Sequence, residues 1–111
     1  MATPTAPEQL AKVALRNVRT WDSVLKPLGY EQITSLAAAA GMTPGAGARS
    51  ALIVAVTQAI RWRDDGTDPT ASIGIPLAVD TPFWYTGDMS AIKFIEVVAS
   101  AEVNISYYGS A

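Results

Sequence analysis

The feature that most constrains this 111-residue chain is a stretch near its middle, where Arg61, Trp62 and Arg63 run directly into the sequence Asp-Asp-Gly-Thr-Asp-Pro. Successive side chains of a β-strand point to opposite faces, so an aromatic residue between two cations predicts a strand with one packed and one wet face. The Gly and Pro cannot extend that strand, and short Asp side chains favour turns. We therefore expect an ordered structural turn after the strand, formed by Asp64, Asp65, Gly66, Asp68 and Pro69.

Short strand patterns recur along much of the chain. Residues 103–108 alternate Val, Ile and Tyr with other residues and predict the clearest half-buried strand. Residues 51–56 form a continuous apolar run rich in β-branched residues, which predicts a strand buried on both faces. Other strands are predicted at 30–34, 59–63, 71–77, 83–85 and 91–98, with a loop at 35–47. Turn signals separate these strands at the spacing of a sandwich, so we expect a mainly β fold, a small antiparallel β-sandwich over residues 30–111.

An amphipathic helix is predicted ahead of the sandwich. Apolar residues recur at helical spacing over residues 7–25, a capping box at Thr5 and Glu8 precedes them, and a proline and a glycine follow. A break near Thr20 that starts a second short turn is an alternative. Residues 1–29 are therefore expected to form an N-terminal helical arm.

The composition limits the classes of partner. Half of the residues are apolar and 16% are charged, which is ample for a core and leaves little polar cover for the surface. The net charge of −2 argues against nucleic-acid binding. Residues 1–29 hold four basic and two acidic side chains, and residues 30–111 hold four basic and eight acidic ones. A basic arm on an acidic body suits self-association, although each sign of charge can equally serve to solvate its own surface.

The residue types offer little for catalysis. The chain has no Cys and no His, which removes thiol nucleophiles, disulfides, the usual zinc sites and a Ser-His-Asp triad. Nothing fixes the separation of Glu96 and Glu102 as an acid–base pair, so solvated strand positions are the expected role of both. No segment has the form of a signal peptide or of a membrane span. We expect no catalytic residue, no enzyme activity, no cofactor and no membrane partner.

Three carboxylates crowd one turn and are candidates for binding Ca²⁺. A calcium loop needs ligands at alternate positions and a bidentate Glu at its end, but the twelfth position counted from Asp64 is Ile75. We therefore expect Asp64, Asp65 and Asp68 to bond to their own turn, with an arginine of the preceding strand nearby, and we expect no metal.

Two sets of side chains are candidates for an interface. One lies on the predicted helix, where three cations are too few for a membrane or nucleic acid and docking on an acidic neighbour is favoured. The other is an aromatic-rich set on the strands, for which core filling, interface anchoring and a carbohydrate platform are the alternatives. The interface candidates are Lys12, Arg16, Arg19, Trp21, Trp84, Tyr85 and Tyr108.

Several segments resemble small virion proteins of tailed bacteriophages. The resemblance lies in Ala-Leu-Ile at 51–53, Arg-Trp-Arg-Asp-Asp-Gly at 61–66, Pro-Thr-Ala-Ser-Ile-Gly at 69–74, Ser-Ala-Ile-Lys-Phe-Ile at 90–95 and Val-Asn-Ile-Ser-Tyr-Tyr at 103–108. It covers residues 30–108 and leaves out the predicted arm.

The resemblance implies a β-sandwich, often jelly-roll-like, and supplies no catalytic residue. It implies a location in the virion after synthesis in the host cytoplasm. The expected role is that of a capsid cement or decoration protein. Its partners would be the major capsid protein, other virion proteins or further copies of itself. A head–tail connector, a tail or fibre component and a carbohydrate-binding module are alternatives.

Overall fold

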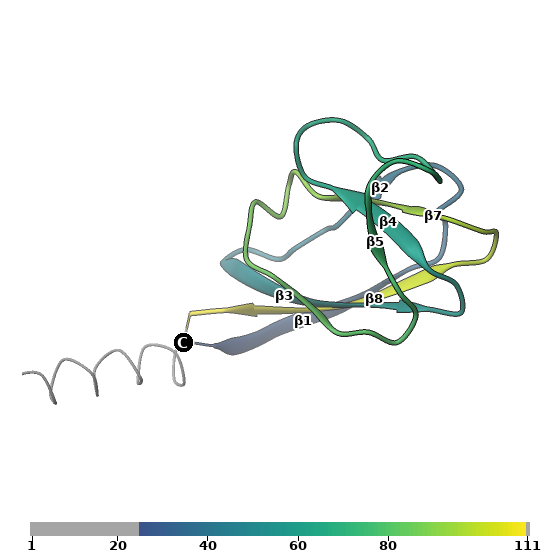
Figure 1. Ribbon diagram of the computed structural model, residues 1–111. Helices are drawn as coiled ribbons and strands as arrows, with labels where there is room; N and C mark the ends of the chain where they lie inside the picture. Colours follow the sequence, from purple (N-terminus) through teal and green to yellow (C-terminus); the bar gives the residue numbers. More distant parts are fainter. Residues whose placement is uncertain (1–24, 111) are drawn as a thin grey trace, which may run out of the picture.

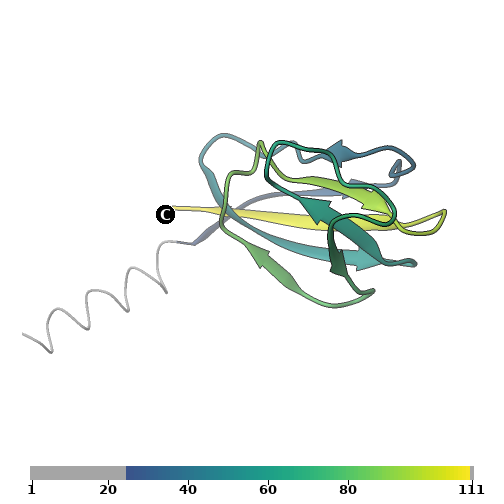
Figure 2. The same ribbon diagram turned by 45° about the horizontal axis from the view of Figure 1, so that its top comes forward.

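The computed structural model describes residues 25–110 and arranges them in two antiparallel β-sheets of four strands each (Figure 1). The sheets lie face to face as two layers, which Figure 2 shows from a second direction. The strands are β1 (Lys26–Ile33), β2 (Ala40–Gly41), β3 (Ala48–Val56), β4 (Ile60–Arg63), β5 (Ile75–Leu77), β6 (Phe83–Tyr85), β7 (Lys93–Glu96) and β8 (Glu102–Gly109). The prediction of a mainly β, antiparallel fold is confirmed. The predicted helix lies outside the described residues, together with Lys12, Arg16, Arg19 and Trp21.

The strand pairing follows a simple rule. The first strand pairs with the last, the second with the seventh, the third with the sixth and the fourth with the fifth, always antiparallel. These pairs alternate between the sheets, which have the orders β1-β8-β3-β6 and β2-β7-β4-β5. A bend at Thr57 and Gln58, between the strands predicted at 51–56 and 59–63, carries the chain from one sheet to the other. The strand after it, β4, therefore does not pair with β3.

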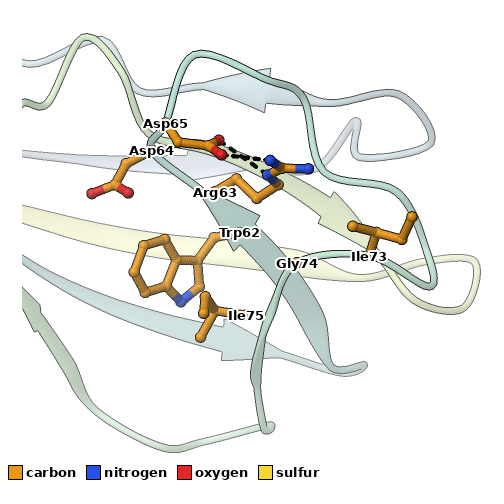
Figure 3. Close-up of a pocket in the computed structure, with 7 residues that line it drawn as sticks. All are labelled: Trp62, Arg63, Asp64, Asp65, Ile73, Gly74 and Ile75. Carbon is orange, nitrogen blue, oxygen red and sulfur yellow. Dashed lines mark hydrogen bonds and ion pairs between the residues drawn. The ribbon is translucent and has the colours of Figure 1, made fainter.

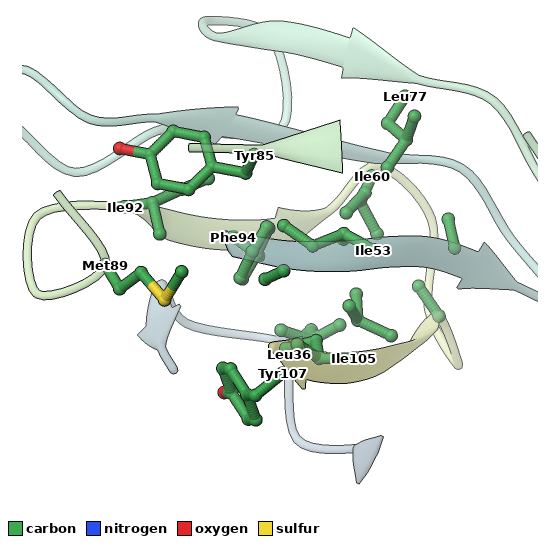
Figure 4. Close-up of a cluster of buried hydrophobic side chains, with 14 residues drawn as sticks. Leu36, Ile53, Ile60, Leu77, Tyr85, Met89, Ile92, Phe94, Ile105 and Tyr107 are labelled. Carbon is green, nitrogen blue, oxygen red and sulfur yellow. The ribbon is translucent and has the colours of Figure 1, made fainter. Parts of the chain in front are cut away.

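The core lies between the inner sides of the two sheets (Figure 4). Val103, Ile105 and Tyr107 of β8 point inward and are buried, and the residues between them are only partly buried. On the opposite sheet, Ile60 of β4 and Phe94 of β7 are fully buried. The alternation predicted for residues 103–108 is thus confirmed, and burial of these apolar sides is the main force that holds the layers together.

Strand β3 departs from its predicted environment. Ala51, Ile53 and Ala55 are fully buried on the inner side, but Leu52 and Val54 on the outer side are only half-buried. The prediction of burial on both faces is wrong for this chain by itself, because a two-layer sandwich covers only one side of each sheet. The apolar outer side of β3 is left at the surface.

The strand that contains Trp62, which runs into the turn at Asp64 to Pro69, has its predicted register. Ile60 is fully buried, and Trp62 packs against the core with its ring stacked on Phe83 at a centroid distance of 4.9 Å. The side chains of Arg61 and Arg63 project from the opposite side of β4. The arginine expected near the carboxylates of the turn is Arg63, which pairs with Asp65. Arg61 instead donates to backbone carbonyl groups.

Several boundaries differ from those predicted. Strand β1 begins at Lys26, so the first four residues of this strand come from the segment assigned to the arm. A bulge at Leu28 turns that side chain towards the core. The predicted strand at 71–77 is β-structure only from Ile75, because the preceding residues form a folded loop. The predicted loop at 35–47 contains the short strand β2.

Two tryptophans at different depths give a test of this packing. We expect Trp62→Ala to lower the free energy of unfolding by about 3 kcal/mol, since it removes a partly buried ring that stacks on Phe83 and packs against the core. Trp84→Ala, which removes a half-exposed ring from the outer side of a sheet, should cost about 1 kcal/mol or less. Urea denaturation followed by circular dichroism measures both. Equal losses for the two variants would contradict the register of β4.

Candidate functional site

One outer face of the sandwich carries most of the exposed aromatic surface. Tyr30 on β1, Leu52 on β3 and Trp84 on β6 lie in one row across the sheet, with a serine of β8 between the first two. Tyr108 lies in the next row, and its ring centroid is 5.4 Å from that of Trp84. Tyr30 is 65% exposed and Trp84 is 51% exposed. With Val54, these residues form what we call the aromatic face: Tyr30, Leu52, Val54, Trp84 and Tyr108.

A polar network fixes one side of the aromatic face. The Tyr30 hydroxyl donates to Asn104 Oδ1 at 2.8 Å, and Gln32 Nε2 donates to the same oxygen at 2.9 Å. Gln32 Nε2 also lies 3.4 Å from a carboxylate oxygen of Glu102. Because these bonds hold the Tyr30 ring in place, a partner that stacks on the ring has less side-chain entropy to restrict.

The predicted interface candidates occupy different environments. Trp84 and Tyr108 lie on the aromatic face, as an interface role requires. Tyr85 is only 6% exposed, so its side chain belongs to the core and is not available to a partner. Tyr30 was missed as a candidate, although alternation in its own segment places it on an outer face. Its place in one row with Trp84 depends on strand pairing, which local sequence does not encode.

Two inward-facing tyrosines connect the sheets through carboxylates. Tyr85 and Tyr107 flank the small Ala51 in one row of the inner side. The Tyr85 hydroxyl donates to Asp64 Oδ2 at 2.9 Å, across to the end of β4. The Tyr107 hydroxyl donates to Glu31, whose carboxylate also accepts the Thr43 backbone N–H at 2.8 Å.

These two hydrogen bonds change the acidity of the phenols. Burial, followed by the bond to Asp64, raises the pKa of Tyr85 to about 12. Burial and the bond to Glu31 also raise the pKa of Tyr107. Both effects favour the neutral phenol, because a phenolate would be poorly solvated and would face a carboxylate. The tyrosines and their carboxylate partners therefore serve the fold.

The structural turn is part of a folded loop at residues 64–74. Asp65 pairs with Arg63 and accepts the Thr67 backbone N–H, which confirms that this carboxylate bonds to its own turn. The same expectation is wrong for Asp64, which accepts the Tyr85 hydroxyl of β6 instead. Gly66 has a φ of 87° and Pro69 is buried, whereas Asp68 is exposed. Within residues 25–110, no three acidic side chains gather as a metal site would require.

Arg61 holds the far end of this loop. Its Nε donates to the Ala71 carbonyl and one terminal nitrogen donates to the Gly74 carbonyl, both at 3.0 Å. The loop therefore lies over the outer side of β4. The Gly74 backbone packs closely against Arg61 and Pro69. A Cβ added to Gly74 would lie 3.0 Å from Arg61 Cβ and 3.2 Å from Pro69 Cβ.

A hollow of about 390 Å³ opens beside this loop (Figure 3). Figure 3 places the Trp62 ring and the Arg63 side chain on opposite sides of β4. Of the charged groups in the hollow, Arg63 and Asp65 bond to each other and Asp64 accepts the Tyr85 hydroxyl. Its charged atoms are thus already engaged, and the aromatic face is the stronger candidate site. The lining residues are Trp62, Arg63, Asp64, Asp65, Ile73, Gly74 and Ile75.

Comparisons with protein-family models, with curated proteins and with solved structures give no match to this chain. A search of the described residues finds no helix of the length and apolar character needed to cross a membrane.

Glycine substitutions test the packing of the loop. Gly74 has a φ of 145° and close neighbours, so Gly74→Ala should destabilise the fold by about 2 kcal/mol. Gly66→Ala, with positive φ but open surroundings, should cost about 1 kcal/mol. Gly45→Ala, which meets no atom within 4 Å, is the neutral control. Thermal unfolding ranks the three variants, and equal melting temperatures for Gly74→Ala and Gly45→Ala would contradict the close contact.

The tyrosine–carboxylate bonds predict a dependence of stability on alkaline pH. The folded pKa of Tyr85, about 12, lies above the unfolded value of about 10. The folded state thus holds this proton more tightly, so the stabilisation is complete below pH 10 and is lost as pH rises through 12. In urea titrations between pH 8 and pH 12, Tyr85→Phe should reduce the alkaline loss of stability by about 1 kcal/mol per pH unit. A variant with the same alkaline slope as the wild type would contradict the assignment.

Proposed function

We propose that this chain is a structural protein of a tailed-bacteriophage virion, acting as a capsid cement or decoration protein. The observation that carries the proposal is the strand order, in which the first strand pairs with the last and successive pairs alternate between the sheets. Such a pairing scheme fits an eight-stranded jelly roll, a fold common in viral capsid and lectin domains. The phage-like segment at 61–66 adds support, since it runs from β4 into a turn, as the strand–turn–strand motif of the resembled proteins implies, although the following strand begins only at Ile75.

The aromatic face is the proposed docking surface for virion proteins, among which are further copies of this chain. Tyrosine and tryptophan are enriched among residues that dominate binding energy, and Trp84 and Tyr108 are adjacent on a sheet that presents few charges. Attachment would then depend on buried surface, with ion pairs in a secondary role. This mode of action requires no chemical step and no cofactor. A head–tail connector would use the same surface but would be present in far fewer copies.

A carbohydrate-binding module is the second candidate function. One specific observation favours it: the amides of Asn104 and Gln32 lie beside the exposed Tyr30 ring, and lectin domains share the jelly-roll fold. Aromatic rings can stack on the apolar faces of sugars while amides bond to hydroxyl groups. Binding of the isolated protein to a glycan array, lost on Tyr30→Ala, would favour this function.

Purified phage particles provide the test of the virion proposal. Quantitative mass spectrometry of particles from the phage that encodes this chain should find it in hundreds of copies per particle. A ring of six or twelve copies would indicate a connector instead, and absence from the particle would reject the proposal. Trp84→Ala should weaken attachment by about tenfold or more. Molar salt should release little wild-type protein, so complete release at moderate salt would show that charge dominates attachment.

A further inference from the structure

We infer that the aromatic face is an interface between two copies of this chain, packed face to face about a two-fold axis with their strands antiparallel. This inference rests on the proposed use of the aromatic face as a docking surface and names the partner that occupies it.

The composition of β3 indicates that the outer side of its sheet is covered. Leu52, Val54 and Val56 alternate on that side and are only half-buried, although the strand is apolar on both sides. Continuous apolar strands are typical of sheets with both faces packed. The neighbouring β8 has polar Asn104 and Ser106 on the same side, so the apolar outer side is a property of β3 and is not general to the sheet.

The edges of both sheets are poorly suited to association. The β1 edge has a bulge at Leu28 next to Pro27, and the Glu31 carboxylate faces inward, features that hinder pairing with a further strand. The β5 edge is three residues long and contains Pro76, which lacks a backbone N–H. Strands β2 and β6 are two and three residues long. A second copy is therefore expected to bind to a face.

The outer face of the other sheet is less available. The folded loop at residues 64–74 lies over the outer side of β4, where Arg61 holds it through two hydrogen bonds. The cations Arg63 and Lys93, which are neighbours in the register of β4 and β7, share that side. Face-to-face packing of two copies there would remove Lys93 and the Arg63–Asp65 ion pair from water, which is unfavourable.

The charged residues at the two ends of the β1-β8-β3-β6 sheet indicate how two copies are oriented relative to each other. At one end of the sheet, Arg49 lies at the irregularity near the start of β3 and the exposed Lys26 begins β1 in the row of the inward-facing Gly109, whereas Glu102 lies at the other end, where β8 begins. The remaining charge of these four strands, Glu31, is bonded to Tyr107. An antiparallel two-fold arrangement places the cations of each copy near the Glu102 of the other. A parallel arrangement would place like charges together, so the antiparallel one is favoured.

Sedimentation of the full-length protein tests the interface, with two valines as a matched pair. Val54 lies on the aromatic face, and Val98 is equally large but lies in the loop before β8, 55% exposed. Val54→Lys should weaken self-association at least tenfold, whereas Val98→Lys should leave it unchanged. Circular dichroism checks that both variants fold. A wild-type monomer at 100 μM, or a folded Val54→Lys variant that associates like the wild type, would overturn the inference.

Charge reversal tests the antiparallel orientation. Glu102→Lys should weaken association at least threefold, because it places a cation against Lys26 and Arg49 of the second copy. Adding Lys26→Glu and Arg49→Glu to the same chain should restore it. Failure of the triple variant to recover would overturn the proposed orientation. Self-association of a protein that is absent from virions would reject the proposed function alone, and a monomeric protein present in virions would reject this inference alone.

Discussion

The burial of one side of the central strands β3 and β8 is the interaction on which the rest of the structure depends. Their alternating apolar residues pack against Ile60 and Phe94 of the second sheet and define the two layers. Ala51 in this row is small enough to leave room for Tyr85 and Tyr107 on either side. Their hydroxyl groups reach carboxylates at the edges of the core. The hydroxyl groups of these two tyrosines are therefore hydrogen-bonded without interrupting the apolar centre of the core.

Within residues 25–110, the two outer faces differ because a loop covers only one of them. The loop at residues 64–74 folds over β4 and is held by Arg61, so the motif that looks most distinctive in the sequence is used within the fold. No loop of the described residues covers the opposite sheet in this way, and its outer side carries exposed aromatic and apolar residues. Exposing an apolar side chain to water is unfavourable, and a partner on this face would remove that unfavourable contact with water.

Proposed attachment and proposed pairing of copies depend on this same exposed sheet. In a dimer the two aromatic faces are buried against each other, so the dimer would attach to a particle through its remaining outer surfaces. It presents each of these surfaces twice, so its attachment would gain from avidity. Loss of the interface between copies would then also weaken attachment. The glycan-binding alternative differs in physical terms, since it depends on the Tyr30 network and requires the aromatic face to remain open to solvent.

The sequence by itself determined the β class, most strand positions and which side of each strand is apolar, because side-chain alternation is a local property of the backbone. It correctly placed Ile60, Trp62 and residues 103–108. It did not determine that β4 leaves the sheet of β3, or that Tyr30 and Trp84 share one row. Those facts depend on pairing between strands far apart in the chain. Only the tertiary structure decided them, because the packing of all eight strands together selects the register.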